Sequence, residues 1–260
     1  MHVFERMFTY KNSNMSDQTY SAMIRTILDN LALVKEGTIY DIADACYTSP
    51  TSISRLCKNL GYKGYSDFKA DVVEMCDHFS FYNFVLPKEP SNDTDQLKND
   101  ISDIYEDVIR EFRNIDNGLL DKLAEEIDRC NSMFYFDYLC NFEQLYALEM
   151  NMAMANKSLY YWSDMKQYDH AVSLLDKETL AVFLIPGIVQ SSYMWTYVKK
   201  AIESEAKVVL LVQTRMNQTI PKEADLIIQF AGRETQIDTI YTNILWKMIA
   251  VLFRKRYLRK

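Results

Sequence analysis

The stretch from Thr38 to Tyr65 restricts the possible fold more than any other part of the chain. Apolar residues recur there at helical spacing in two runs, first Ile39, Ile42, Ala43 and Cys46, then Ile53, Leu56, Cys57 and Leu60. Ser49 and Pro50 stand directly before the second run and are typical of a helix N-cap and first helical position. Gly61 is a common residue just past a helix end. The sequence therefore predicts two short helices joined by a tight turn, a helix-turn-helix motif.

The second predicted helix carries polar side chains opposite its apolar face, at Thr51, Ser52, Ser54, Arg55, Lys58 and Asn59. In a helix-turn-helix motif, the second helix enters the major groove of DNA, where its side chains contact base edges. Between Pro50 and Ala70 the chain is also locally cationic, with Arg55, Lys58, Lys63 and Lys69 against Asp67. The motif is therefore predicted to bind DNA.

The overall charge excludes one class of DNA-binding protein. A net charge of −7 and a pI near 5.1 argue against a protein that coats nucleic acid non-specifically. A sequence-specific binder needs a basic surface only where it meets phosphate. The 260 residues, 48% hydrophobic and 25% charged, are enough for one small and one medium globular domain.

Cysteine and histidine usage predicts neither a metal site nor a cofactor. The five cysteines are widely spaced and lie within apolar patterns, and the three histidines are far apart in sequence. Reduced thiols in a cytoplasmic protein are the expected interpretation. The N-terminus lacks the apolar core of a signal peptide, and no apolar run could span a bilayer. We expect a soluble, cytoplasmic protein without a membrane partner.

The remainder of the first domain is predicted to form a small helical core. Residues 1–18 are polar and indicate an arm or frayed extension. A helix from Tyr20 is predicted by the stripe Met23, Ile24, Ile27, Leu28 and Leu31, and Thr38 is a plausible N-cap for the helix that follows. Past Gly61, the aromatic residues Tyr62, Tyr65 and Phe68 are expected in the core, while Lys63 could contact phosphate.

The run from Thr38 to Lys69 also carries a family pattern. Its matching residues are Thr38, Ile39, Ile42 and Ala43, then Ser49, Ser52, Ile53, Ser54 and Arg55, then the uninterrupted segment LGYKGYSDFK at 60–69. In this register the run resembles the N-terminal domain of the RpiR family of bacterial transcriptional regulators. The resemblance implies regulation of sugar or amino-sugar metabolism genes. It also implies a second, sugar isomerase (SIS) domain that binds a phosphosugar effector.

The rest of the chain fits such a second domain. Residues 79–115 are predicted to form a linker and a connecting helix, with Asp95 as its cap, leaving 1–78 as the DNA-binding domain. From 116 to 260, helical patterns alternate with apolar strands predicted at 133–138, 159–162, 180–185, 207–212 and 225–230. This alternation predicts an α/β fold whose five-stranded parallel sheet is flanked by helices, an order similar to a SIS domain.

The loops that should hold a phosphosugar depart from the family pattern. SIS domains resembling this one place G-x-G-x-S after the first strand, where this chain has Asp137, Leu139 and Asn141. After the third strand, the pattern S-x-S-G-x-T is matched only at Ser191. Two interpretations remain open: Asn141, Gln190, Ser191 and Ser192 bind a different ligand, or the domain only associates copies of the chain.

These patterns predict a homodimeric or homotetrameric transcription regulator that binds an inverted-repeat operator in double-stranded DNA. Thr51, Ser52, Ser54 and Arg55 would read base edges, and Ser49, Lys58 and Lys63 would hold phosphates. No catalytic residue is predicted. The rival interpretation is a sugar-phosphate isomerase or lyase on the SIS scaffold, and a protein–protein adaptor is the third.

Overall fold

The chain divides into two compact units, Met1–Tyr82 and Asn83–Lys260, in a computed structural model. The structure describes residues 3–13, 18–77, 92–137, 142–162, 167–185, 191–213, 220–230 and 238–257. We call Met1–Tyr82 the helical unit and Asn83–Lys260 the sheet unit.

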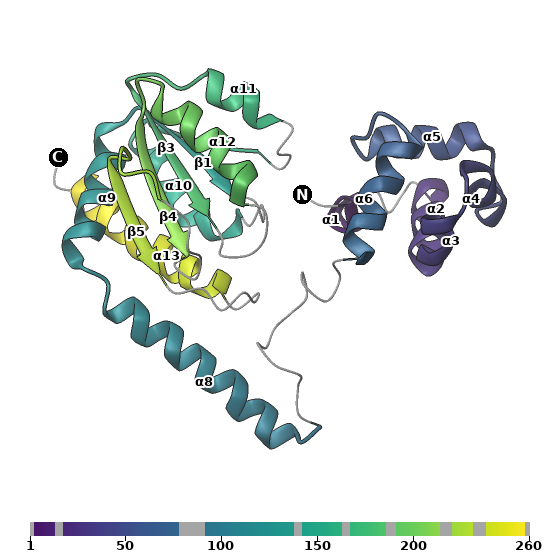
Figure 1. The fold of residues 1–260 in the computed structure, drawn as a ribbon, viewed down its shortest axis with the longest axis horizontal. Coiled ribbons are helices and arrows are strands. Elements are labelled where there is room, and N and C mark those ends of the chain that lie inside the picture. Colours follow the sequence, from purple (N-terminus) through teal and green to yellow (C-terminus); the bar gives the residue numbers. More distant parts are fainter. Residues whose placement is uncertain are drawn as a thin grey trace. The chain divides into compact units, whose positions relative to one another are not determined.

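The described part of the helical unit consists of helices around one apolar core (Figure 1). Their bounds are α1 Val3–Ser13, α2 Gln18–Asp29, α3 Leu31–Glu36, α4 Ile39–Ala45, α5 Pro50–Asn59 and α6 Tyr65–Asp77. The two apolar runs of the sequence lie on α4 and α5, where Ile42, Ile53 and Leu56 are buried in the core. The predicted helix-turn-helix pair is therefore α4 and α5.

The N-terminal segment differs from the expected frayed arm. Residues 3–13 form α1, and the side chains of Val3 and Met7 are fully buried. Val3, Met7 and the half-buried Tyr10 recur at helical spacing, and the Tyr10 ring meets Tyr20 of α2 edge-on at 6.3 Å. The prediction of an arm was wrong because the polar residues of this segment obscured a short apolar stripe that packs on the core.

The helix predicted from Tyr20 is interrupted. Helix α2 ends at Asp29, and Leu31 belongs to α3. Asn30 between them leaves the helical conformation (φ −131°, ψ 44°), and its Nδ2 donates to Thr26 O at 2.8 Å. The local side-chain hydrogen bond of an asparagine competes with helix continuation, which explains the break.

The sheet unit contains the predicted parallel sheet, in the order β2-β1-β3-β4-β5. The strands are β1 Ser132–Asp137, β2 Ser158–Tyr161, β3 Thr179–Ile185, β4 Lys207–Gln213 and β5 Leu226–Phe230. All neighbouring strands pair in parallel, with Phe136 opposite Phe183 and Leu184 opposite Leu211. The α/β fold class predicted from the sequence is confirmed.

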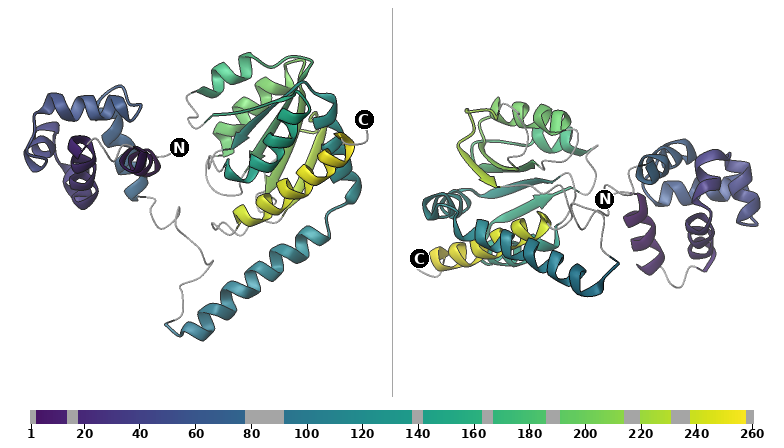
Figure 2. Two further views of the ribbon diagram at one scale, coloured as in Figure 1. Left: turned by 180° about the vertical axis from the view of Figure 1, so that it is seen from behind. Right: turned by 60° about the horizontal axis from the view of Figure 1, so that its bottom comes forward.

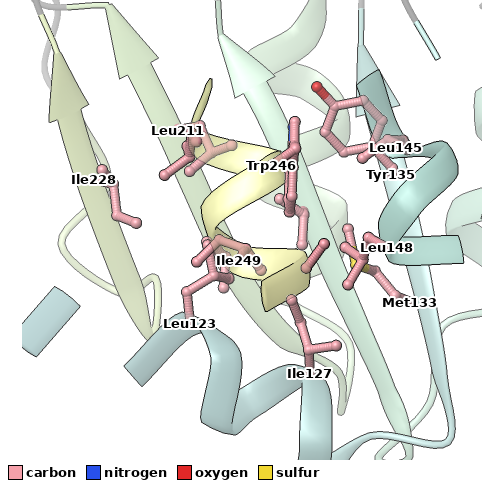
Figure 3. Packing of buried hydrophobic residues seen from close by; sticks show 14 of the residues in the cluster. Leu123, Ile127, Met133, Tyr135, Leu145, Leu148, Leu211, Ile228, Trp246 and Ile249 are labelled. Carbon is pink, nitrogen blue, oxygen red and sulfur yellow. The ribbon is translucent and has the colours of Figure 1, made fainter. Parts of the chain in front are cut away.

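Helices cover both faces of this sheet (Figures 1 and 2). They are α9 Asn117–Arg129, α10 Tyr146–Met154 after the short 3-10 helix Glu143–Leu145, α11 Tyr168–Ser173, α12 Ser191–Ile202 and α13 Asp238–Tyr257. Helix α8 Thr94–Arg113 packs against α13. Alternate strand residues enter separate apolar clusters, because successive side chains of a strand point to opposite faces. On the α13 face, Trp246 and Ile249 pack with Leu123, Ile127 and Leu148 (Figure 3).

Other local predictions need correction in the sheet unit. Helix α8 is capped by Asp93, whose Oδ1 accepts from Asp95 N at 3.0 Å, so Asp95 is not the cap. Helix α9 begins after Asp116, as expected. The short helix α11 has no counterpart in the sequence analysis, because six residues carry too little periodicity to predict it.

Two further findings concern the described residues of both units. Among the described residues, no helix has the length and apolar character needed to cross a bilayer. The described cysteines Cys46, Cys57, Cys76 and Cys130 are free thiols. Burial raises the pKa of the Cys57 thiol to about 12 and that of Cys130 to about 11, so both stay protonated near neutral pH.

Candidate nucleic-acid interface

Side-chain caps fix where α4 and α5 begin. Thr38 Oγ1 accepts from Asp41 N at 3.4 Å, and Asp41 Oδ2 accepts from Thr38 N at 2.6 Å, which completes a capping box. The Asp41 carboxylate accepts hydrogen bonds from Thr38 N and, at 2.7 Å, from Thr38 Oγ1, and these two bonds lower its pKa. Ser49 caps α5 by accepting from Ser52 N at 3.2 Å, and Pro50 is the first helical residue. Both predicted N-caps are confirmed.

The apolar residues Ile53, Leu56 and Cys57 bury one side of α5, so its other side faces outward. Thr51, Arg55 and Lys58 are exposed there, and Ser52 and Ser54 are partly exposed. Neither Arg55 nor Lys58 forms an ion pair with any residue that the structure describes. Their charges therefore remain available to an anionic partner.

Two of the predicted DNA-contacting hydroxyl groups already interact with each other. Ser49 Oγ lies 3.0 Å from Ser52 Oγ, in addition to its capping bond with the Ser52 amide. Both side chains lie at the N-terminal end of α5, the end from which a recognition helix contacts base edges. These hydroxyl groups are thus oriented by the cap as well as placed on the outward face.

The turn after α5 and the start of α6 hold aromatic residues that pack in the core and a lysine that is exposed. Tyr62 and Phe68 are buried and meet edge-on at 5.5 Å, and the half-buried Tyr65 lies 6.3 Å from Phe68. The predicted core position of these aromatic rings is confirmed. Lys63 is exposed between them, whereas Lys69 Nζ donates to Gly37 O at 2.7 Å within the helical unit. Lys63 is the cation of this pair that faces solvent.

Backbone hydrogen bonds and an arginine of α1 cap the C-terminal end of α5. Tyr62 N donates to Cys57 O and Gly61 N to Lys58 O, both at 2.9 Å, the pattern of a Schellman cap with Gly61 in the left-handed region (φ +87°). Arg6 Nη1 donates to Leu60 O at 3.0 Å, and the guanidinium lies 5.2 Å from the Tyr62 ring centroid. The role of Arg6 was not predicted, because residues 1–18 were expected to form an arm or frayed extension.

The turn between α4 and α5 holds a second residue that sequence reasoning missed. Tyr47 has φ +51°, and its side chain is 99% exposed. Its N–H donates to Asp44 O at 3.0 Å, and Thr48 N donates to Ala43 O at 2.8 Å. The position two residues before Ser49 places this tyrosine next to the N-terminal end of α5. A glycine-like conformation at a tyrosine leaves no signal in the side-chain pattern.

The structure describes the predicted effector residues only in part. Asn141 and Gln190 lie outside the described residues, and Ser191 and Ser192 begin α12 without described side chains. Asp137 is the last residue of β1 and is fully buried. The Tyr168 hydroxyl accepts from Asp137 N at 3.1 Å and donates to Asp137 O at 2.9 Å, so the backbone at this strand end is already hydrogen-bonded.

The geometry of α4, α5 and their caps defines the helical unit as a DNA-binding domain of the helix-turn-helix class. Residues 9–77 match the family model described as "Helix-turn-helix domain, rpiR family". Residues 9–77 are therefore similar to the rpiR family of helix-turn-helix domains, and the resemblance drawn from the sequence is confirmed.

Comparisons with individual proteins cover more of the chain. An uncharacterized HTH-type transcriptional regulator of Providencia stuartii is 21% identical over 170 residues, which are 65% of this chain and 60% of that protein. The chain thus spans less than two thirds of that relative's length. Among solved structures, the NanR protein of Vibrio vulnificus complexed with ManNAc-6P aligns with a TM-score of 0.52 and 18% identity, covering 97% of this chain and 93% of that chain. At this identity the alignment shows a shared fold.

A further solved structure aligns with a smaller part of the chain. The sugar isomerase domain of the RpiR transcription factor from Sphaerobacter thermophilus is 12% identical, with a TM-score of 0.44, and covers 61% of this chain and 91% of that chain.

Proposed function

We propose that this protein is a sequence-specific transcription regulator of the RpiR type that binds an operator in double-stranded DNA. The observation that carries the proposal is the outward face of α5, where Thr51, Arg55 and Lys58 are exposed on a helix capped at both ends. Rigid presentation of polar and cationic side chains is what groove recognition requires. The structurally similar NanR protein is complexed with ManNAc-6P, an amino-sugar phosphate, and this supports genes of sugar or amino-sugar metabolism as the proposed targets.

Arg55 and Lys58 serve different purposes in this proposal, and their variants separate base reading from phosphate binding. Fragments of genomic DNA that bind the full chain supply the operator. Arg55→Ala should then cost about 1–3 kcal/mol in operator binding and relax specificity at one base pair. Lys58→Ala is the matched control. It should weaken binding to all DNA sequences alike and lower the slope of log affinity against log salt by about 1. Operator binding by Arg55→Ala with unchanged affinity and specificity at fixed salt would remove the assignment.

The rival function is sugar-phosphate isomerisation or cleavage by the sheet unit. That chemistry needs a positioned acid–base group beside a phosphate cradle. His170 is exposed on α11, and the main-chain groups of Asp137 at the end of β1 are bonded to Tyr168. These observations favour the regulator over the enzyme. Turnover of a sugar phosphate by the purified chain would reverse that preference.

The sheet unit would associate two or more copies of the chain. Tyr146, Met150 and Met154 are 65%, 52% and 66% exposed, and their spacing puts them in one stripe along α10. Large apolar side chains gathered on one face of a helix mark an interaction surface. A homodimer formed through this stripe would carry paired DNA-binding units, which suits an inverted-repeat operator.

Whether the sheet unit also senses a ligand is decided by a thermal-shift series. A ligand that binds only the folded state raises its melting temperature. ManNAc-6P, the ligand complexed with the NanR relative, belongs in the series with other sugar phosphates and their unphosphorylated forms. A shift without turnover supports an effector site, and no shift across the panel supports a purely associating domain.

A further inference from the structure

Three helix ends in the described part of the chain share one backbone arrangement. After α4, α5 and α10, the N–H groups of two successive residues close the helix in the Schellman pattern. The residue in the left-handed region is Tyr47 (φ +51°) after α4, Gly61 (φ +87°) after α5 and Asn156 (φ +56°) after α10. Glycine and asparagine tolerate this conformation, whereas a tyrosine side chain disfavours it.

The helical unit gives Tyr47 no stabilising contact that would offset this conformational cost. Its side chain is 99% exposed, and among the described residues only its backbone N–H has a partner, Asp44 O. By contrast, Tyr62 and Tyr65 in the turn after α5 pack against Phe68. The side chain of Tyr47 is therefore available to a partner outside the unit.

The position of Tyr47 indicates what that partner is. It lies two residues before Ser49, the cap of α5, so the ring extends from the turn beside the end of α5 that enters the groove. Phosphates border the groove at that end, and tyrosine hydroxyl groups are among the donors that bind them. The hydroxyl is neutral, so it can donate a hydrogen bond to phosphate without displacing a counterion.

We propose that Tyr47 donates its hydroxyl hydrogen to a backbone phosphate of the operator and thereby fixes the α4–α5 turn on the DNA. This inference rests on the proposed function and adds a neutral contact to the cationic ones. Tyr47 would strengthen binding to DNA of any sequence and would not discriminate between base pairs.

The test uses the full chain and its selected operator fragment in titrations at several salt concentrations. Tyr47→Phe removes only the hydroxyl and should weaken binding about tenfold, because hydrogen bonds to charged groups are among the stronger ones. The base preference should stay as in the unmodified chain. The slope of log affinity against log salt should also stay unchanged, whereas Lys58→Ala lowers it. The control Tyr160→Phe, at a 48% exposed ring of β2, should bind normally.

A second variant separates DNA contact from folding. Tyr47→Gly relieves the left-handed conformation and should raise the melting temperature of the helical unit while weakening operator binding at least as much as Tyr47→Phe. Normal affinity in either variant would overturn the inference. Arg55→Ala is measured in parallel: if it loses discrimination while both Tyr47 variants bind normally, the proposed function stands and only the inference about Tyr47 fails.

Discussion

The end of the recognition helix allows a stability prediction that can be worked out from distances. Gly61 has φ +87°, and a Cβ atom placed on it would lie 2.5 Å from Arg6 Nη1. Gly61→Ala therefore combines two costs. Holding alanine in the left-handed region costs about 1–2 kcal/mol. Displacing Arg6 disrupts its bond to Leu60 O, and a hydrogen bond involving a charged group is worth about 1.5–3 kcal/mol. Because this site is only partly buried, we expect Gly61→Ala to lower the free energy of unfolding of the helical unit by about 2–4 kcal/mol in total.

The two costs can be separated with a double-mutant cycle. In an Arg6→Ala background the clash is gone, so Gly61→Ala should cost only the backbone term of about 1–2 kcal/mol. Gly64→Ala is a matched control in the same turn, because a Cβ at Gly64 would meet nothing within 4 Å. The free energy of unfolding of Gly64→Ala should stay within about 0.5 kcal/mol of that of the unmodified chain.

Urea unfolding of the full chain provides the assay, with two signals that report different units. All three tryptophans, Trp162, Trp195 and Trp246, lie in the sheet unit, so their fluorescence follows that unit alone. Circular dichroism follows the helices of both units. Gly61→Ala should lower the urea concentration at which the helical unit is half unfolded, as followed by circular dichroism. The fluorescence transition of the sheet unit should stay unchanged. An equal cost in both Arg6 backgrounds, or a cost no larger than that of Gly64→Ala, would refute the reasoning.

The remaining predictions concern pH and association. Hydrogen bonds to Thr38 lower the pKa of Asp41, so its contribution to stability is present above the unfolded value of about 3.9 and is lost as pH falls through the lower folded value. Asp41→Asn should flatten this acid dependence in circular dichroism melts between about pH 5 and pH 3, and an unchanged slope would contradict the capping role. Met150→Lys should shift the chain toward monomer in sedimentation velocity, with the exposed His170→Lys as control, and an unchanged distribution would exclude the α10 stripe as the interface.

The sequence predicted best those parts of the fold in which local signals agree with tertiary packing. Ser49, Pro50 and Gly61 bound α5 as expected, because capping hydrogen bonds and backbone conformation depend on a few adjacent residues. The buried strands were also predicted to within a residue or two, since seven consecutive buried residues in β3 leave a clear apolar run.

The missed features depend on contacts between segments distant in sequence. Helix α1 is held by Val3 and Met7 in the core and by the bond from Arg6 to Leu60, 54 residues away. Its apolar residues recur at helical spacing, but so short a stripe does not indicate which part of the chain it packs against. Tyr47 was missed for a different reason: its backbone conformation is imposed by the cap of α4, and no side-chain pattern reports a positive φ.

The start of the first loop of the sheet unit bears on the choice between sensing and association. Phosphate sites in parallel sheets use free backbone N–H groups beyond the carboxyl ends of strands. Here the Asp137 N–H, at the end of β1, donates to the Tyr168 hydroxyl, whose ring is fully buried and meets Phe136 edge-on at 5.1 Å. Freeing this amide for a phosphate would require moving a buried side chain of α11, and the phosphate would then lie beside the Asp137 carboxyl group. A glycine at this position would leave the backbone N–H accessible to a phosphate. The cost of freeing the Asp137 amide therefore favours a sheet unit that joins copies of the chain over one that binds a phosphosugar at the end of β1.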